Sequence, residues 1–306
     1  MLRSIISGMA GCALALLASC QTTALNPYPG IETRKLTSGT LYVTPSDHPT
    51  LLIFIEGSGM NSVLGLKNGV LWDSVGFAYY VYNHYRGDFD IAIPEKLDYS
   101  FGEDYQNDLE RMPRYTVDGL VSSYAAALDD FLSSKNYDTV ILFGISEGGL
   151  LLPRILNNLR YKGSVTKMVV WGAGGYSQEE CFRILGGSAI PMPQGYREEC
   201  LKIDTVLEEV AKDPYSLTKG YLGWPYNRWS SFFPYQPIQE YKAINVPVLF
   251  VQGKRDYSSP VESVQFLQVY RGDRQYSAKY YDMGHIPEED TETIRILDEI
   301  AAWIRE

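Results

Sequence analysis

A serine with glycines on both sides is the feature of the sequence most directly able to do chemistry. Ser146 lies in the segment GISEG, residues 144–148, a G-x-S-x-G pattern that follows an apolar run ending at Phe143. A sharp strand-to-helix turn here would lift the hydroxyl above the end of the strand, and the glycines would let neighbouring backbone come close. A helix beginning after Ser146 would direct its N-terminus towards developing negative charge. The pattern predicts a nucleophilic serine.

A serine hydroxyl is a poor nucleophile until a base takes its proton, and the chain offers three histidines. His285 directly follows the last expected strand, at the sheet edge where open α/β sheets bind their ligands. His48 lies in a polar turn and His84 in the segment NHYR, and both are expected to be surface or structural residues. His285 is therefore the predicted general base.

The base in turn needs a carboxylate that fixes its tautomer and stabilises the imidazolium. Asp256 comes five residues after Val251, again at a strand end, and is favoured over Asp282 and Glu262. Asp282 is only three residues from His285, which is too local to reach the ring well. The alternative role for Asp256 is that of a helix cap or turn carboxylate.

Alternating strands and helices must position these residues. Six apolar runs suit strands buried on both faces, and several apolar stripes suit helices between them. The expected strands are 51–55, 89–93, 139–143, 167–171, 246–251 and 278–281, and the expected helices are 117–132, 150–159, 261–270 and 291–304. Strand–helix alternation predicts an α/β fold with a mostly parallel sheet covered on both faces.

One stretch, about 176–242, breaks the alternation and is expected to be an inserted cap over the sheet. It contains two cysteines and a dense aromatic block between Tyr221 and Tyr235. Such a block fits the wall of an apolar pocket, while the alternative is a small satellite core under long loops. Cys181 and Cys200 would close a loop of about twenty residues, and we expect them to form a structural disulfide, with two free buried thiols as the alternative.

The order Ser146, Asp256, His285, with its strand–turn–helix context, resembles the α/β-hydrolase family over about residues 41–304. The resemblance extends to the segment IFIEGSG, residues 53–59, which is similar to the strand-then-glycine segment that carries the family's oxyanion hole. It implies that the amide of Ser58 or Gly57 acts together with that of Glu147. The Ser-Glu-Gly-Gly turn is similar to that of esterases of the dienelactone-hydrolase and prolyl-oligopeptidase-like branches.

The N-terminus has the features of an export signal. One arginine precedes a short apolar run, and Leu-Ala-Ser-Cys at residues 17–20 resembles the lipobox of bacterial lipoproteins. This implies a signal peptide over 1–19, lipidation of Cys20, a tether over 20–30 and a hydrolase domain over 31–306. Because Gln21 rather than aspartate follows Cys20, the resemblance implies an outer-membrane anchor facing the periplasm of a two-membrane bacterium. The lipid membrane is thus one expected partner.

The composition and the remaining motifs narrow the possible classes of partner and cofactor. The chain of 306 residues has 27 basic and 37 acidic side chains, a net charge of −10, which disfavours a nucleic-acid partner. The segment GAGG at 172–175 lacks the full G-x-G-x-x-G spacing of a dinucleotide site and is interpreted as a turn beside the active site. No Cys, His or carboxylate group has the spacing of a metal site, so neither a metal nor a cofactor is expected.

These features predict a lipid-anchored serine hydrolase that cleaves a small ester or acyl substrate through an acyl-enzyme. The sequence leaves two alternatives open: a serine peptidase of the prolyl-oligopeptidase-like type, and a non-catalytic envelope lipoprotein on a hydrolase scaffold. It does not specify the oligomeric state.

Overall fold

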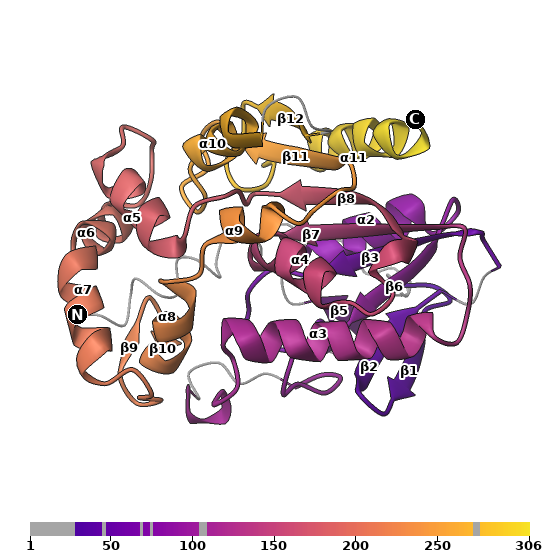
Figure 1. The fold of residues 1–306 in the computed structure, drawn as a ribbon, viewed down its shortest axis with the longest axis horizontal. Helices are drawn as coiled ribbons and strands as arrows, with labels where there is room; N and C mark the ends of the chain where they lie inside the picture. Colours follow the sequence, from indigo (N-terminus) through magenta and orange to yellow (C-terminus); the bar gives the residue numbers. More distant parts are fainter. Residues whose placement is uncertain (1–27, 45–46, 68–69, 74–75, 104–108, 272–275) are drawn as a thin grey trace.

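The computed structural model describes residues 28–306 apart from 45–46, 68–69, 74–75, 104–108 and 272–275 (Figure 1). The expected signal peptide, Cys20 and most of the expected tether lie outside the described residues. Every helix within them is too short or too polar to cross a membrane.

A central eight-stranded sheet organises the described residues. Its order is β1-β2-β6-β3-β7-β8-β11-β12, with the two N-terminal strands antiparallel at one edge and the other six parallel. The strands are β1 (Glu32–Leu36), β2 (Gly39–Val43), β3 (Thr50–Ile55), β6 (Asp90–Pro94), β7 (Thr139–Ile145), β8 (Val165–Trp171), β11 (Val248–Gly253) and β12 (Tyr276–Tyr281). All six strands expected from the apolar runs are present.

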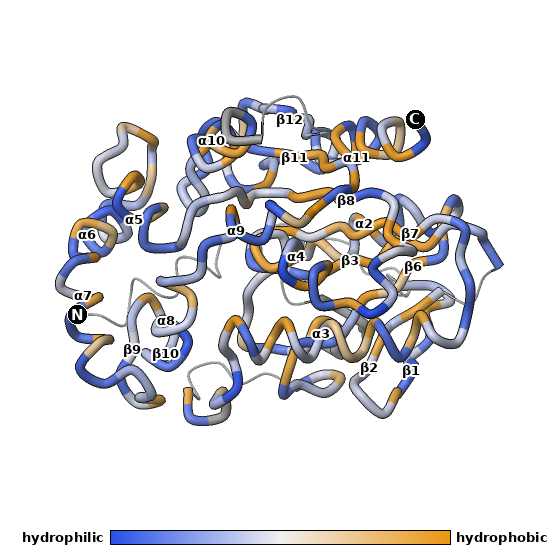
Figure 2. Tube along the Cα trace, in the orientation of Figure 1, coloured by the Kyte–Doolittle hydropathy of each residue, from blue (hydrophilic) through white to orange (hydrophobic). Residues whose placement is uncertain are grey.

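Helices cover both faces of the sheet, because its parallel strands present apolar side chains on both sides. On β3, Leu51, Ile53 and Ile55 contribute to the core under one layer of helices, and Leu52 and Phe54 to the core under the other. The first layer holds α3 (Val117–Leu132), α4 (Glu147–Asn158) and α10 (Glu262–Arg271), and the second holds α2 (Phe77–Tyr85) and α11 (Asp290–Arg305). Figure 2 shows the hydrophobic residues concentrated in the central strands. The architecture is the α/β fold expected from the sequence.

Smaller elements complete this layered body. They are the antiparallel hairpin of β4 (Leu64–Lys67) with β5 (Val70–Asp73), and the 3₁₀ turns η2 (Leu109–Arg111) and η3 (Lys162–Ser164).

Residues 178–241 form a helical insertion between β8 and β11, in the segment where the sequence predicts a cap. Its elements are α5 (Gln178–Gly187), α6 (Gln194–Leu201), α7 (Ile203–Lys212), β9 (Gly220–Tyr221), β10 (Trp224–Pro225), α8 (Tyr226–Phe232) and α9 (Pro237–Tyr241). In Figure 1, α5 to α8 lie beyond the end to which the arrow of β8 points. The insertion therefore lies on the side of the sheet where the strands end.

Several rings of the aromatic block in the helical insertion pack on one another. The rings of Tyr221, Trp229 and Phe233 contact one another and Phe182 of α5, with centroids 4.9–6.5 Å apart. All four side chains are buried. They belong to the same hydrophobic cluster as the core under the first layer of helices, so they extend that core and do not form a separate satellite core. The apolar pocket wall stays a prediction.

The predicted disulfide is wrong for this structure. Cys181 on α5 and Cys200 on α6 are both buried and both free. Burial raises the pKa of the Cys200 thiol to about 11 and raises that of Cys181 further still, so each thiol stays protonated in its apolar site. The alternative of two buried thiols, left open by the sequence, is what the structure contains.

Candidate active site

Ser146 lies on a strained turn between β7 and α4. Its backbone has φ 54° and ψ −121°, a conformation that side chains with a Cβ rarely adopt. The turn is held by the main chain, because the Ser146 amide donates a hydrogen bond of 2.8 Å to the carbonyl of Trp171 at the end of β8. Strain of this kind persists only where the surroundings enforce it, and it is concentrated at functional sites. The sharp turn predicted from the sequence is present.

The glycine after the turn allows close approach of backbone. A Cβ on Gly148 would lie 2.3 Å from the carbonyl oxygen of Ile55, so only glycine lets α4 begin against the end of β3. At that same strand end, a Cβ on Gly57 would lie 3.3 Å from the Cβ of Ser146. The segment after β3 therefore runs directly beside the serine.

His285 and Asp256 form a pair at the ends of β12 and β11. Nδ1 of His285 lies 2.8 Å from Oδ2 of Asp256, whose side chain is fully buried. The other carboxylate oxygen accepts hydrogen bonds from the amides of Ser258 and Ser259, at 2.7 and 3.0 Å. Gln252 on β11 donates to Oδ2 at 3.2 Å. Both oxygens of the buried Asp256 carboxylate therefore have hydrogen-bond partners.

The pKa of His285 is raised above its ordinary value. Burial by itself would lower this pKa, but the charge of Asp256 and the hydrogen bond to it outweigh that effect. The buried Nε2 of His285 has no hydrogen-bond partner among the described residues. It is thus the nitrogen left to accept a proton.

One short segment connects the histidine with the serine turn. The carbonyl of Trp171 accepts a hydrogen bond from the Ser146 amide. The indole Nε1 of the same residue donates a hydrogen bond of 3.0 Å to the carbonyl of His285. The next residue, Gly172, has φ +62°, and the His285 ring packs against it. The segment 172–175 thus begins with a turn beside His285, where the sequence predicts a turn next to the active site. The sequence signal for it was only a glycine cluster after a strand.

The other carboxylates considered from the sequence lie elsewhere. Asp282 is exposed and binds Arg255 at 2.9 Å, and Glu262 is an exposed residue at the start of α10. His84 lies on α2 with its Nε2 3.3 Å from Asp298, and the amide of His48 donates to Asp90. Asp282, His84 and His48 therefore have partners other than His285 and Asp256.

The three expected oxyanion donors differ in their availability. The amide of Gly57 donates to Oε1 of Glu56 at 2.8 Å, so it is already used, contrary to the expectation that it might serve. Oε2 of the same buried glutamate accepts the amide of Ala78 at the start of α2. No hydrogen bond from the Ser58 amide is found among the described residues, and the Glu147 amide, first in its helix, has no intrahelical acceptor. Ser58 and Glu147 are the better candidates.

The Glu147 side chain makes contacts that the sequence did not predict. It is buried, accepts a hydrogen bond of 2.7 Å from Tyr115, and its Oε2 lies 2.6 Å from Nη1 of Arg228 on α8. No local spacing relates these residues, which lie far apart in the chain.

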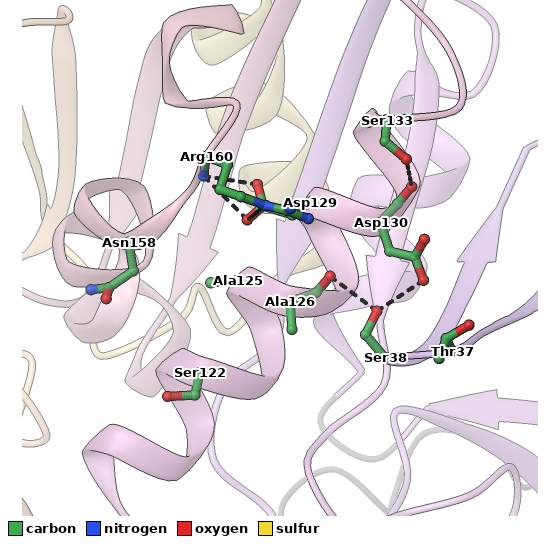
Figure 3. A pocket seen from close by; sticks show the side chains of 10 residues that line it. All are labelled: Thr37, Ser38, Ser122, Ala125, Ala126, Asp129, Asp130, Ser133, Asn158 and Arg160. Carbon is green, nitrogen blue, oxygen red and sulfur yellow. Dashed lines mark hydrogen bonds and ion pairs between the residues drawn. The ribbon is translucent and has the colours of Figure 1, made fainter.

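A surface hollow of about 550 Å³ lies elsewhere, along α3 and the turn between β1 and β2 (Figure 3). None of the candidate catalytic residues lines it. Its polar side chains bind one another: Asp129 accepts from Arg160, and Asp130 accepts from Ser38. In the described ranges, no cluster of three or more histidine, cysteine or acidic side chains could hold a metal ion.

Of three comparisons with known proteins, only the one with solved structures finds matches. No family model matches the sequence, and no curated protein matches it. Solved structures do match the fold. An esterase of Pyrococcus furiosus has a TM-score of 0.62 at 13% identity, covering 94% of this chain and 95% of its own. An alpha/beta hydrolase fold protein of Chitinophaga pinensis has a TM-score of 0.53 at 14% identity, covering 90% of this chain and 99% of its own.

Two peptidases also share the architecture. The acylaminoacyl peptidase of Pyrococcus horikoshii matches with a TM-score of 0.57 at 12% identity over 90% of this chain. A puromycin-hydrolyzing peptidase of Mycobacterium tuberculosis matches with a TM-score of 0.56 at 15% identity over 92% of this chain. In both cases the match spans 40% of the peptidase. The chain has the α/β-hydrolase fold.

Proposed function

We propose that the chain is a serine hydrolase that cleaves carboxylic esters through an acyl-enzyme. The observation that carries the proposal is the strained Ser146 turn, joined through Trp171 and Gly172 to a histidine held by a buried carboxylate. In this arrangement Ser146 is the nucleophile, His285 the general base and Asp256 the residue that orients it.

The reaction follows from these roles. Oγ of Ser146 attacks the ester carbonyl carbon while Nε2 of His285 takes its proton, and Asp256 stabilises the resulting imidazolium. The amides of Ser58 and Glu147 donate to the oxyanion, and each such donor is worth about 3–4 kcal/mol of barrier. His285 then protonates the leaving alcohol, and water attacks the acyl-enzyme in a second round of the same proton transfers. No cofactor takes part.

A peptidase is the second candidate, favoured by the two peptidases in which 40% of the chain matches this fold. An ester substrate is preferred because its alcohol leaves more easily than an amine. Rates on a panel of p-nitrophenyl esters and aminoacyl-p-nitroanilides distinguish these two classes.

The primary test uses a fluorophosphonate, which labels an activated serine. We expect the wild-type chain to be labelled at Ser146, and Ser146→Ala to lose both labelling and ester turnover while its thermal midpoint stays near that of wild type. Absence of labelling in the folded wild-type protein would indicate instead a non-catalytic protein on this fold. Turnover that survived in Ser146→Ala would refute the assignment of the nucleophile.

We further propose that the chain is exported and anchored by lipid at Cys20, with its catalytic domain in the periplasm. The lipobox-like segment supports this, and the proposal is tested by metabolic labelling with radioactive palmitate. Label should be incorporated into the wild-type chain and not into Cys20→Ser. A soluble, unlabelled wild-type chain would contradict it.

A further inference from the structure

A buried ion pair connects the serine turn with the helical insertion. Glu147 directly follows Ser146, and Arg228 lies on α8 of the insertion. Their side chains are each 5% exposed, with Nη1 and Oε2 2.6 Å apart. Because removing both charges from water is costly, such a pair is weak evidence for stability and calls for another explanation.

The surroundings hold the Arg228 guanidinium in one place. Its Cζ lies 3.7 Å from the ring centroid of Phe232 and 4.4 Å from that of Trp224, with Trp229 and Tyr115 at 5.2 and 5.5 Å. Aromatic faces attract a guanidinium, and the attraction is stronger where water is excluded. The insertion therefore presents a fixed positive charge to the Glu147 carboxylate.

Tyr115 supplies a second contact to that carboxylate, from the segment before α3. Its hydroxyl donates to Oε1 of Glu147 at 2.7 Å. Burial, with the charge of Glu147, raises the pKa of Tyr115 well above its ordinary value, so the hydroxyl keeps its proton and remains a donor. Oε1 of Glu147 is thus held by a hydrogen bond from Tyr115, and Oε2 by its ion pair with Arg228. Oε2 has no hydrogen bond among the described residues, so the charge of Arg228 is what compensates it.

The restraint acts next to the reacting atoms. The Glu147 amide belongs to the peptide unit that joins it to Ser146, and this amide is one of the two expected oxyanion donors. Fixing the Glu147 side chain limits rotation of that peptide unit. Pairing with Arg228 also neutralises a carboxylate that would otherwise lie, uncompensated, one residue from a developing negative charge.

We infer that Arg228 is a positioning residue for the nucleophile: by holding Glu147 it fixes the oxyanion-binding amide, so the helical insertion completes the active site. This inference rests on the proposed serine-hydrolase function. Arg228 acts through Glu147 and need not touch the substrate, so its loss should lower kcat rather than raise KM.

The test compares Arg228→Met with Arg228→Lys, using p-nitrophenyl ester turnover and the rate of fluorophosphonate labelling. Arg228→Met should lower kcat and the labelling rate by about tenfold or more, with KM changed less than about threefold. Arg228→Lys restores a positive charge and should recover most of the lost rate. The matched control is Arg154→Met, which removes an arginine of α4 that pairs with Asp118 and Glu240 away from the serine. It should leave kcat unchanged.

A second variant keeps the test valid where Arg228→Met does not fold. Glu147→Gln combined with Arg228→Met leaves no unpaired charge and preserves an acceptor for Tyr115. It should keep a thermal midpoint near that of wild type and still show the reduced kcat. Wild-type kcat in either folded variant, or failure of lysine to recover the rate, would overturn the inference. A wild-type protein with neither labelling nor turnover would instead refute the proposed function itself.

Discussion

The imidazole of His285 packs against the Cα of Gly172, so that a Cβ built there would lie 2.6 Å from Cε1 and 2.9 Å from Nδ1. The same glycine has φ +62°, which disfavours any residue with a Cβ. Since Gly172 follows the residue whose carbonyl binds the Ser146 amide, this contact sets the position of the proposed general base relative to the proposed nucleophile.

Replacing that glycine should therefore impair catalysis more than folding. In Gly172→Ala the new methyl group displaces the His285 ring, and a displacement of this size costs about 100-fold in kcat. The left-handed backbone adds about 1–2 kcal/mol of destabilisation. Both effects are measured by ester turnover and urea unfolding. Gly163→Ala is the control, because a Cβ there meets nothing within 4 Å. Equal kcat values for the two variants would exclude a positioning role for Gly172.

The raised pKa of His285 predicts the pH dependence of turnover. The base must be neutral to act, so kcat/KM should rise with pH around a midpoint above the ordinary histidine value of about 6.5. Folding stability should change with pH in the opposite direction. The stabilisation that protonated His285 contributes is fully present below the ordinary histidine pKa, and it is lost as pH rises through the raised pKa of the folded state.

Two aspartate variants test the cause of that shift. Asp256→Asn removes the charge that raises the pKa, so the midpoint should fall and kcat should drop by about 10⁴-fold. Asp282→Asn, close to His285 in sequence but exposed and bound to Arg255, should leave the midpoint in place. If both variants have the wild-type midpoint, Asp256 does not set the pKa of His285.

The sequence predicted the parallel strands because most of them are short runs rich in apolar residues, such as LLIFI at 51–55, and it placed Ser146, Asp256 and His285 at strand ends. It missed β1 because Glu32–Leu36 is a charged, largely exposed edge strand without apolar alternation. It also missed α2, whose residues FAYYVYNHY are too uniformly apolar and aromatic to show a helical stripe.

The side chains that support the site could not be predicted in the same way. Arg228 pairs with Glu147, and Glu56 accepts the amide of Ala78. These partners are far apart in the chain, and no local spacing encodes them. The free cysteines have a similar explanation, because spacing permits a bridge whereas only the placement of both side chains decides it.

The strained backbone at Ser146 predicts that glycine at this position is more stable than alanine. Glycine adopts φ 54° without a Cβ clash, whereas alanine does not. Neither Ser146→Gly nor Ser146→Ala has a nucleophile, so both should be inactive, but the glycine variant should be more stable by about 1 kcal/mol. Urea unfolding compares the two directly, and equal stabilities would show that the turn is not strained.

Glu56 should matter for stability, because its buried carboxylate accepts the amides of Gly57 and Ala78. In Glu56→Gln, one carboxylate oxygen becomes an amide group that cannot accept, which leaves a buried N–H without a partner. The expected cost is about 1–3 kcal/mol in the free energy of unfolding. Glu208→Gln, at an exposed position of α7, serves as the control and should cost close to nothing. A cost as small as the control's would mean that these two amides find other acceptors.

The two free thiols predict that no disulfide links α5 to α6 in the helical insertion. When the protein is unfolded in denaturant without reductant, Cys181 and Cys200 should both alkylate, and mass spectrometry should find their peptides separate. In the native protein both thiols should react slowly with a disulfide reagent near neutral pH, because burial raises their pKa values and the thiolate is the reacting species. Adding reductant should leave the thermal midpoint unchanged. A linked peptide pair, or a midpoint lowered by reductant, would instead establish a bridge between α5 and α6.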